Sequence, residues 1–450
     1  MKCSLPSLWI LLSICISASA ETHKLDDFDG DGSLGQRWTA SGEIQASREP
    51  LEGAAPENGP AGNVMRLSSE GNFALYTKIP TADEIKWAEA EKIAFWVYQE
   101  EAVETRIDVL ALEPDRKAFF WRKCTFSEAG WQRIELPLAW FRWENLRLPR
   151  WEQVRLFGIR GSGAMNLRFD GFELIDADPD AGANYSLEDL TELAFPDDDT
   201  EKIQVVADDR AWVLTNSPEI DAEQLHEHLA AARTSLENAV PSWRRPAGRH
   251  QAPRLIVFHE RKDYAAFFER MGEKISASIT APSSGGYHVQ GIGVSYFSEE
   301  HGTLRPVFLH EFIHSFGTFV ALQGSSGGDW FQEGLANLMQ MRVHPQPGLS
   351  KIIEQGLDNE NYRDSLEDLT SGGRISGTRY WQALSFLDCL MRDEKLSENF
   401  PDLLKEIELS GSSDLSRHLE QVYGLSFEEI EGKNKYLQTN CNNALYYSNQ

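Results

Sequence analysis

The sequence predicts a multidomain protein, with an N-terminal all-β sandwich and a C-terminal α+β domain. Three observations predict this division. From Leu25 to about Ile175, short apolar, aromatic and β-branched runs alternate with glycine, proline and charged residues. An acidic segment follows, and beyond it strand patterns alternate with helical periods before a mostly helical end. The 450 residues are enough for two or three domains.

The first twenty residues have the pattern of a signal peptide. Lys2 gives a positive start, residues 5–17 are mostly apolar, and Ala18-Ser19-Ala20 supplies small residues for cleavage before Glu21. No later apolar run reaches the ~20 residues that span a bilayer. We therefore expect a secreted or periplasmic protein that does not insert into a membrane after cleavage.

The composition is strongly acidic. The net charge is -27, and it becomes -28 when Lys2 leaves with the signal. Such a charge repels phosphate backbones and anionic lipid, which argues against nucleic acid as a partner. Cys124, Cys389 and Cys441 remain after the signal. They allow at most one intrachain disulfide, and if one forms we favour Cys389 with Cys441, so the fold must depend on its core.

Seven strands are expected in the sandwich domain, for which we assign residues 21–175. Aspartate and aromatic residues mark its start and end, as in Asp26-Asp27-Phe28 and Phe169-Asp170-Gly171-Phe172, and Gly130-Trp131-Gln132 opens a strand in the middle. These features resemble the jelly-roll modules of carbohydrate-binding and galactose-binding-like domains. The expected strands are Phe73–Ile79, Lys92–Tyr98, Thr105–Leu112, Ala118–Cys124, Trp131–Leu136, Val154–Ile159 and Asn166–Ile175.

Two features of this domain have alternative interpretations. Eight of the 13 tryptophans lie between Trp38 and Trp151. They form either the core of the sandwich, which we favour, or an exposed row that binds sugar. The segment from Asp27 to Gly32 resembles the start of a calcium loop, but position twelve holds Trp38 where a glutamate is needed. We therefore favour an Asp/Gly turn.

Residues 176–201 are acidic, with two prolines and little apolar period, which is typical of a linker. We assign residues 202–450 to the second domain. Its helices are expected at Asp221–Val240 and Asp263–Met271, and the chain is mostly helical from Arg305 onward. Its expected strands are Ile203–Ala207, Ala211–Thr215, Arg254–Phe258 and Gly291–Phe297.

The segment His310-Glu311-Phe312-Ile313-His314 carries the chemistry of the second domain. Residues four apart share a helix face, so His310 and His314 can direct their imidazoles at one zinc ion. Glu311 then lies beside the metal as a general base. A catalytic zinc ion has three protein ligands, and Glu333 in Trp330-Phe331-Gln332-Glu333-Gly334 can return on a second helix as the third. The alternative is a pair of helix-surface histidines with an incidental glutamate between them.

These motifs resemble the gluzincin metallopeptidases, in particular the peptidase MA-like group with its His-Glu-x-x-His and Glu-Gly-x-Ala elements. The resemblance covers residues 202–437 and implies a thermolysin-like domain that binds Zn²⁺ through His310, His314 and Glu333, with Glu311 as base. It also implies an edge strand that pairs with the substrate, here residues 291–297. Tyr380 is a candidate oxyanion donor, or else a helix-packing tyrosine. Asn337 stands where thermolysin-type enzymes have an aspartate that orients a histidine.

The function expected from these residues is that of a secreted zinc peptidase, which hydrolyses peptide or protein substrates with metal-activated water and a glutamate base. The sandwich domain adds a possible glycan partner. The alternative function is that of a secreted carbohydrate-binding protein with a catalytically inactive zinc domain. No recognisable nucleophile motif surrounds the cysteines, and no Gly-x-Ser-x-Gly element is present.

Overall fold

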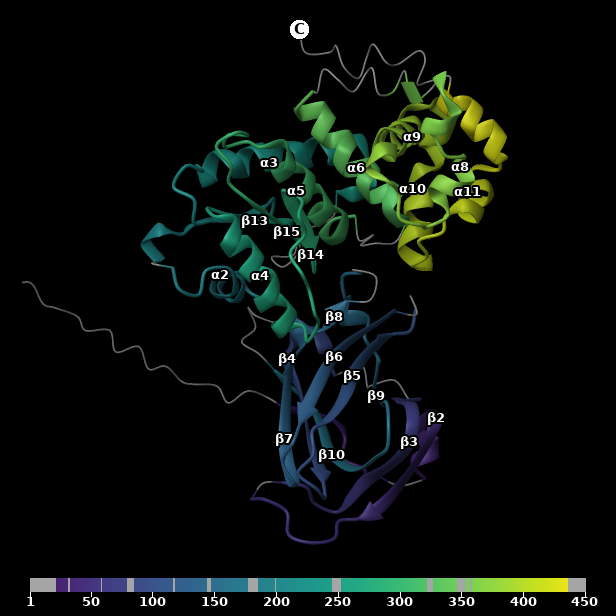
Figure 1. Ribbon diagram of the computed structural model, residues 1–450. Coiled ribbons are helices and arrows are strands. Elements are labelled where there is room, and N and C mark those ends of the chain that lie inside the picture. Colours follow the sequence, from purple (N-terminus) through teal and green to yellow (C-terminus); the bar gives the residue numbers. More distant parts are fainter. Residues whose placement is uncertain are drawn as a thin grey trace, which may run out of the picture.

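The computed structural model describes residues 22–435, except for gaps at 31–32, 58, 79–84, 116–117, 144–146, 177–184, 199, 245–251, 322–326, 346–352, 354 and 357. An N-terminal sheet domain lies at one end, and a larger domain with most of the helices lies at the other (Figure 1). The expected signal peptide and Cys441 lie outside the described residues. In the part of the chain that is described, no helix is both long and apolar enough to cross a bilayer.

The N-terminal domain is built on one ten-stranded antiparallel sheet that folds over itself. The strand order is β7-β4-β10-β3-β9-β5-β6-β8, with β1 paired to β10 and β2 paired to β3. The strands are β1 (Thr22–Asp26), β2 (Trp38–Pro50), β3 (Asn63–Thr77), β4 (Ala90–Gln99), β5 (Thr105–Glu113), β6 (Ala118–Phe126), β7 (Gly130–Pro137), β8 (Arg142–Trp143), β9 (Leu156–Gly161) and β10 (Met165–Asp176). A single turn of helix, α1 (Leu34–Arg37), precedes β2.

The long strand β3 joins the two layers of this sandwich. Its first half, Met65–Ser69, pairs with β10, and its second half, Phe73–Tyr76, pairs with β9. Both layers therefore share one strand, and the apolar residues of their inner faces form a common core. The expectation of an all-β sandwich is confirmed, and each of the seven expected strands is present, although Ile79 lies outside the described residues.

The tryptophans of the sandwich domain belong mostly to the core. Five of the eight are buried, and the three others are half-buried. An arginine guanidinium lies over the ring of Trp96 and another over Trp121, while the ring of Trp131 lies 5.4 Å from that of Tyr98. The core interpretation therefore holds for the majority, and the other three face outward beside polar residues.

In the expected linker at residues 176–201, the described residues 185–198 contain a helix and are packed against both domains. Helix α2 (Leu187–Ala194) begins at Ser186, whose side chain forms a capping box with Asp189. Tyr185 is 2% exposed and stacks on Trp140 of the sandwich at 5.4 Å. The acidic composition predicted a solvated connector, but its few apolar residues are enough to pack this segment against both domains.

The second domain contains a five-stranded mixed sheet in the order β11-β12-β13-β15-β14. The three central strands run parallel and both edge strands run antiparallel to their neighbours. The strands are β11 (Gln204–Ala207), β12 (Trp212–Thr215), β13 (Arg254–Phe258), β14 (Gly286–Val289) and β15 (Ile292–Tyr296). The four expected strands are therefore present, and β14 is an additional one.

Helices cover both faces of this sheet, which explains why its central strands are apolar throughout. Val213, Leu255 and Val257 belong to the same core as α3 (Ala222–Ala239) and α5 (Pro306–Phe319). Alternate residues such as Ile256 and Phe258 face α4 (Arg261–Lys274) and the sandwich domain. The chain continues through α6 (Gly328–Val343), α8 (Leu366–Thr370), α9 (Tyr380–Arg392), α10 (Glu394–Ser410) and α11 (Ser416–Tyr423).

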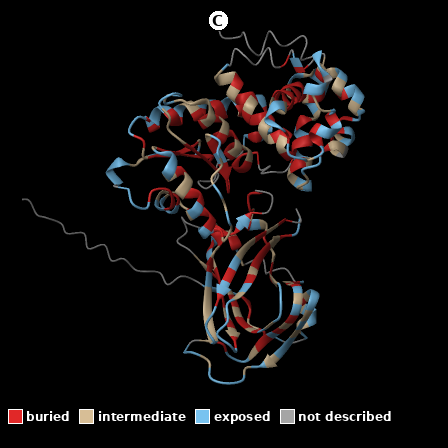
Figure 2. Cartoon of the chain, in the orientation of Figure 1, coloured by how far each residue is buried: buried red, intermediate tan, exposed pale blue. Residues whose placement is uncertain are grey.

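The two domains meet at the hairpin between β14 and β15. The Gln290 side chain accepts a hydrogen bond from the Trp143 backbone N–H at 3.3 Å and donates one to the Phe141 carbonyl at 3.1 Å. The Tyr185 hydroxyl donates to the Gln290 carbonyl at 3.0 Å. Trp143 packs edge-on against Phe319 of α5, with ring centroids 6.1 Å apart. Figure 2 shows buried residues on both sides of this junction.

Candidate metal centre

Helix α5 carries two histidines that converge on one point. Pro306 occupies its first turn, where a missing N–H costs nothing, and Phe308, Phe312 and Phe316 bury it in the core. The one-turn spacing of His310 and His314 places their Nε2 atoms 3.1 Å apart. Their side chains are 14% and 8% exposed. The histidines therefore face a site inside the domain, and the helix-surface alternative does not describe them.

Helix α6 brings a carboxylate to the same point. Glu333 Oε2 lies 3.3 Å from His310 Nε2, and Oε1 lies 3.5 Å from His314 Nε2. One ligand atom from each of the three residues falls within 4.8 Å of the others, and no other group of three potential ligands does so within the described ranges. Ligands about 2.0–2.1 Å from a zinc ion at tetrahedral angles lie about 3.3 Å apart, so this donor set fits zinc.

The Glu-Gly pair of the second motif has a packing reason. Helix α6 crosses α9 so closely that a Cβ atom on Gly334 would lie 2.9 Å from the Ala383 carbonyl oxygen. Glycine at this position lets the two backbones touch. The contact holds Glu333 near the start of α9, where Tyr380 lies.

Charge is distributed unevenly over these three residues. Burial alone would raise the pKa of Glu333, but hydrogen bonding and charge from the two histidines outweigh it and lower that pKa to about 2. Burial would likewise lower the pKa of His310, but its hydrogen bond to Glu333 and the nearby carboxylates raise it. Burial and the charge of His310 lower the pKa of His314 to about 4. The carboxylate is therefore ionised at neutral pH and His314 is neutral, as a metal ligand must be.

Glu311 lies between α5 and the sheet. It is 5% exposed, and burial raises its pKa to about 8. Two glycines make room for it: a Cβ atom on Gly286 would lie 2.6 Å from Glu311 Cγ, and one on Gly293 would lie 2.6 Å from the Glu311 carbonyl oxygen. A carboxyl group with a raised pKa beside a ligand pair can take up a proton near neutral pH.

The edge strand beside this site is β14, which corrects the expectation for residues 291–297. Strand β15 pairs with β13 on one side and with β14 on the other, so its backbone N–H and C=O groups are hydrogen-bonded within the sheet and cannot pair with a substrate. Strand β14 has a neighbour only on the β15 side in the sheet order. It was missed because Ser284-Gly285-Gly286 resembles a loop and leaves few residues to show alternation.

Tyr380 is the first residue of α9, and its side chain forms a hydrogen bond with Glu333. Burial and the carboxylate of Glu333 raise the pKa of Tyr380 to about 12, so the hydroxyl stays protonated and can donate. Tyr380 also packs at the edge of the core. The two interpretations of this residue, as donor and as packing residue, are compatible.

Two polar residues near the site were not expected from the sequence. The His310 side chain hydrogen bonds to Gln340, which lies seven residues after Glu333 and so on the same face of α6. The side chain of Asn337 donates instead to the Glu333 carbonyl at 2.7 Å. Gln340, and not Asn337, therefore holds a histidine in this structure. His288 on β14 is the other residue: its ring lies 5.8 Å from that of His314 and 3.3 Å from the Thr318 hydroxyl.

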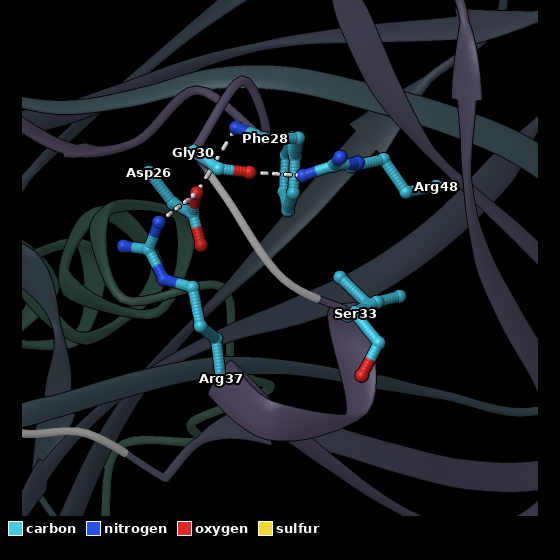
Figure 3. Close-up of a pocket in the computed structure, with 7 residues that line it drawn as sticks. Asp26, Phe28, Gly30, Ser33, Arg37 and Arg48 are labelled. Carbon is cyan, nitrogen blue, oxygen red and sulfur yellow. Dashed lines mark hydrogen bonds and ion pairs between the residues drawn. The ribbon is translucent and has the colours of Figure 1, made fainter.

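The calcium-like segment near the N-terminus forms a turn. Asp26 accepts hydrogen bonds from the Phe28 N–H at 3.0 Å and from Trp38 Nε1 at 2.8 Å, and Arg37 lies 3.3 Å from it. Arg48 donates to the Gly30 carbonyl across a small pocket (Figure 3). The carboxylates of Asp27 and Asp29 accept hydrogen bonds from Lys24, from the Asp29 N–H and from Asn63, which agrees with the Asp/Gly interpretation. Residues 31 and 32 lie outside the described residues.

Comparison with known proteins identifies no family for this chain. No protein-family model matches it, and no curated protein does. Among solved structures, the family 11 carbohydrate-binding module from Clostridium thermocellum aligns with 20% identity over 36% of this chain and 98% of its own, at a TM-score of 0.28. A family 22 xylan-binding domain from Paenibacillus barcinonensis aligns with 13% identity over 36% of this chain and all of its own, at 0.25.

An exo-beta-agarase aligns over a longer stretch, with 14% identity over 48% of this chain and 31% of its own, at a TM-score of 0.28. These identities and scores are too low to assign a function to the chain.

Proposed function

We propose that this chain is a zinc-dependent peptidase. The observation that carries the proposal is the convergence of His310, His314 and Glu333 from two helices, with Glu311 beside them and an edge strand alongside. A zinc ion bound there would supply a Lewis acid that lowers the pKa of water and polarises a carbonyl. His310, His314 and Glu333 would hold it.

The other residues have roles that follow from their positions. The ionised form of Glu311 accepts a proton from the attacking water and returns it to the leaving nitrogen, and burial makes this carboxylate a stronger base than an exposed one. The edge of β14 that pairs with no other described strand offers backbone N–H and C=O groups to an extended peptide, which adds to the sheet as a further strand. The Tyr380 hydroxyl donates a hydrogen bond to the oxygen that becomes negative when the carbonyl is attacked.

The test is Glu311→Gln in the full-length chain, with casein as substrate and metal content measured on the same sample. We expect zinc to remain bound and hydrolysis to fall by at least about a hundredfold, because the variant cannot take up the proton. Glu420→Gln is the matched control, since Glu420 is exposed on α11. Cleavage by the Glu311 variant at the wild-type rate would refute the role of this residue.

A second candidate function, glycan binding by the sandwich domain, has its own observation. Tyr98 and Trp131 lie opposite each other on β4 and β7, half-buried and facing outward, and Arg168 lies over the Tyr98 ring at 4.9 Å. Aromatic faces beside polar groups are suited to the flat, partly apolar faces of sugars. If this face binds glycan, Trp131→Ala should abolish retardation of the protein in gels that contain a soluble polysaccharide. Equal migration of both proteins across a polysaccharide panel would exclude this surface.

A further inference from the structure

A second pair of histidines lies away from the candidate metal centre. His228 belongs to α3, and His344 follows directly after the last residue of α6. Their Nε2 atoms lie 3.2 Å apart, and their ring centroids lie 5.2 Å apart. The two residues are 116 positions apart in the sequence. Their approach is therefore a product of the fold and not of local spacing.

The candidate metal centre provides a reference for this distance. The Nε2 atoms of His310 and His314 lie 3.1 Å apart, almost the same separation. Both distances are close to the separation of about 3.3 Å between two nitrogens that share a tetrahedral zinc ion. The His228–His344 pair therefore needs little movement to hold an ion between its nitrogens.

The surroundings of this pair favour neutral imidazoles. Both rings are half-buried, and desolvation lowers the pKa of each histidine. Elsewhere His226 and His259 lie within 3.2 Å of a carboxylate, whereas neither His228 nor His344 has an ion pair with any described residue. A neutral nitrogen with a free lone pair is the form that binds metal.

We infer that His228 and His344 form a second metal site, which binds a first-row transition-metal ion such as Zn²⁺ or Cu²⁺ through two imidazole nitrogens. Imidazole selects these ions over Mg²⁺ and Ca²⁺, which prefer oxygen ligands. No third histidine, cysteine or carboxylate joins the pair among the described residues, so water completes the coordination. The site is open and binds more weakly than the three-ligand centre.

An ion at this site would link two helices of the candidate metal centre's domain. His344 lies at the C-terminal end of the helix that carries Glu333, and His228 lies on the helix that packs beside α5. Binding that is specific to the folded state stabilises it in proportion to ion concentration. The second site would therefore hold α6 against α3 and raise the unfolding temperature.

The experiment is calorimetric titration of the full-length, tag-free, metal-free chain with Zn²⁺. We expect the wild type to bind one equivalent tightly and a further one more weakly. His228→Ala and His344→Ala should each lose the weaker equivalent and keep the tight one. His228→Gln should fold like the wild type, because glutamine retains hydrogen bonding, and should also lose it. His301→Ala is the matched control, since His301 is exposed and bonds only to Ser298 among the described residues.

Two results would overturn the inference: a wild type without the weaker equivalent, or a His228→Gln variant that retains it. The second result would assign the pair to a simple hydrogen bond between neutral rings. A wrong assignment of the three-ligand centre would give a different result. In that case the tight zinc equivalent would survive His310→Ala, while His228→Gln would still remove the weaker one.

Discussion

Gln340 and Glu333 lie about two turns apart on one face of α6, and both contact His310. The hydrogen bond to Gln340 helps to orient the His310 ring, as the hydrogen-bond partners of metal-ligating histidines do in other proteins. The seven-residue spacing from Glu333 was visible in the sequence. What could not be derived was which polar residue of that face reaches the ring, because that depends on how α6 crosses α5.

We predict that Gln340→Ala weakens zinc binding about 10–100-fold, the usual cost of removing a partner of a ligand histidine. The measurement is competition with a chromophoric chelator. Gln421→Ala, on the exposed side of α11, should bind zinc as the wild type does. An unchanged affinity in the Gln340 variant would show that packing alone orients His310.

Asp208 stabilises the start of the second domain through several hydrogen bonds. Burial would raise its pKa, but bonds from the Arg210 side chain, two backbone N–H groups and His226 lower it from 3.8 to about 2. Because the folded-state pKa lies below the unfolded-state value, the ionised carboxylate stabilises the fold above pH 4. That contribution is lost as the pH falls from about 4 to about 2.

We therefore predict that Asp208→Asn lowers the unfolding temperature at pH 7, and that its difference from the wild type shrinks as the pH falls from about 4 towards 2. Thermal unfolding followed by circular dichroism at several pH values measures this. Asp402→Asn, at an exposed position of α10, should track the wild type throughout. A gap that stays constant with pH would contradict the role given to the carboxylate.

At the scale of elements, strands with clear alternation and the wholly apolar strands β12 and β13 were predicted, whereas the mostly exposed β2 and the short β14 were missed. Strand β2 is mostly exposed along Trp38–Pro50, so its apolar period is too weak to detect. The helices α5 and α6 of the candidate metal centre were predicted from their motifs, and the close contact of α6 with α9 depends on Gly334. The motif indicated a glycine there, but only the crossing of α6 and α9 shows why it is needed.

We predict that Gly334→Ala destabilises the protein by about 1–3 kcal/mol, because the added methyl group would overlap the backbone of α9. Gly317→Ala is the matched control on α5: its Cβ atom would meet nothing within 4 Å. That helix substitution should stabilise by about 0.5–1 kcal/mol. Chemical denaturation of both variants gives the comparison, and equal effects would remove the packing explanation.

At the scale of the whole molecule, two domains with a linker were predicted, but the apolar core runs from the sandwich into one face of the second domain's sheet without interruption. The residues that join them, such as Trp143 and Gln290, are far apart in the sequence and carry no pattern that marks an interface. The domain composition was therefore predictable, and the docking of the domains was not.

We predict that the wild type unfolds in a single calorimetric transition, because the shared core couples the domains. Trp143→Ala should lower the transition temperature, with a loss of about 3–5 kcal/mol for a buried tryptophan. Trp131→Ala, on the outer face of the sandwich, should have a much smaller effect. Two well-separated transitions in the wild type would show that the domains are energetically independent.

The hairpin that ends at Gln290 sets a limit on how this protein can be rearranged. Its strand β14 borders the candidate metal centre, while its tip is held by backbone groups of the sandwich. Replacing the sandwich with another module in a gene fusion would leave the Gln290 side chain without its bonds to Phe141 and Trp143 and expose apolar residues on that side of the sheet to water. The sandwich domain therefore supports the hairpin of β14 and β15, and exchanging it for an unrelated module would disturb the second domain.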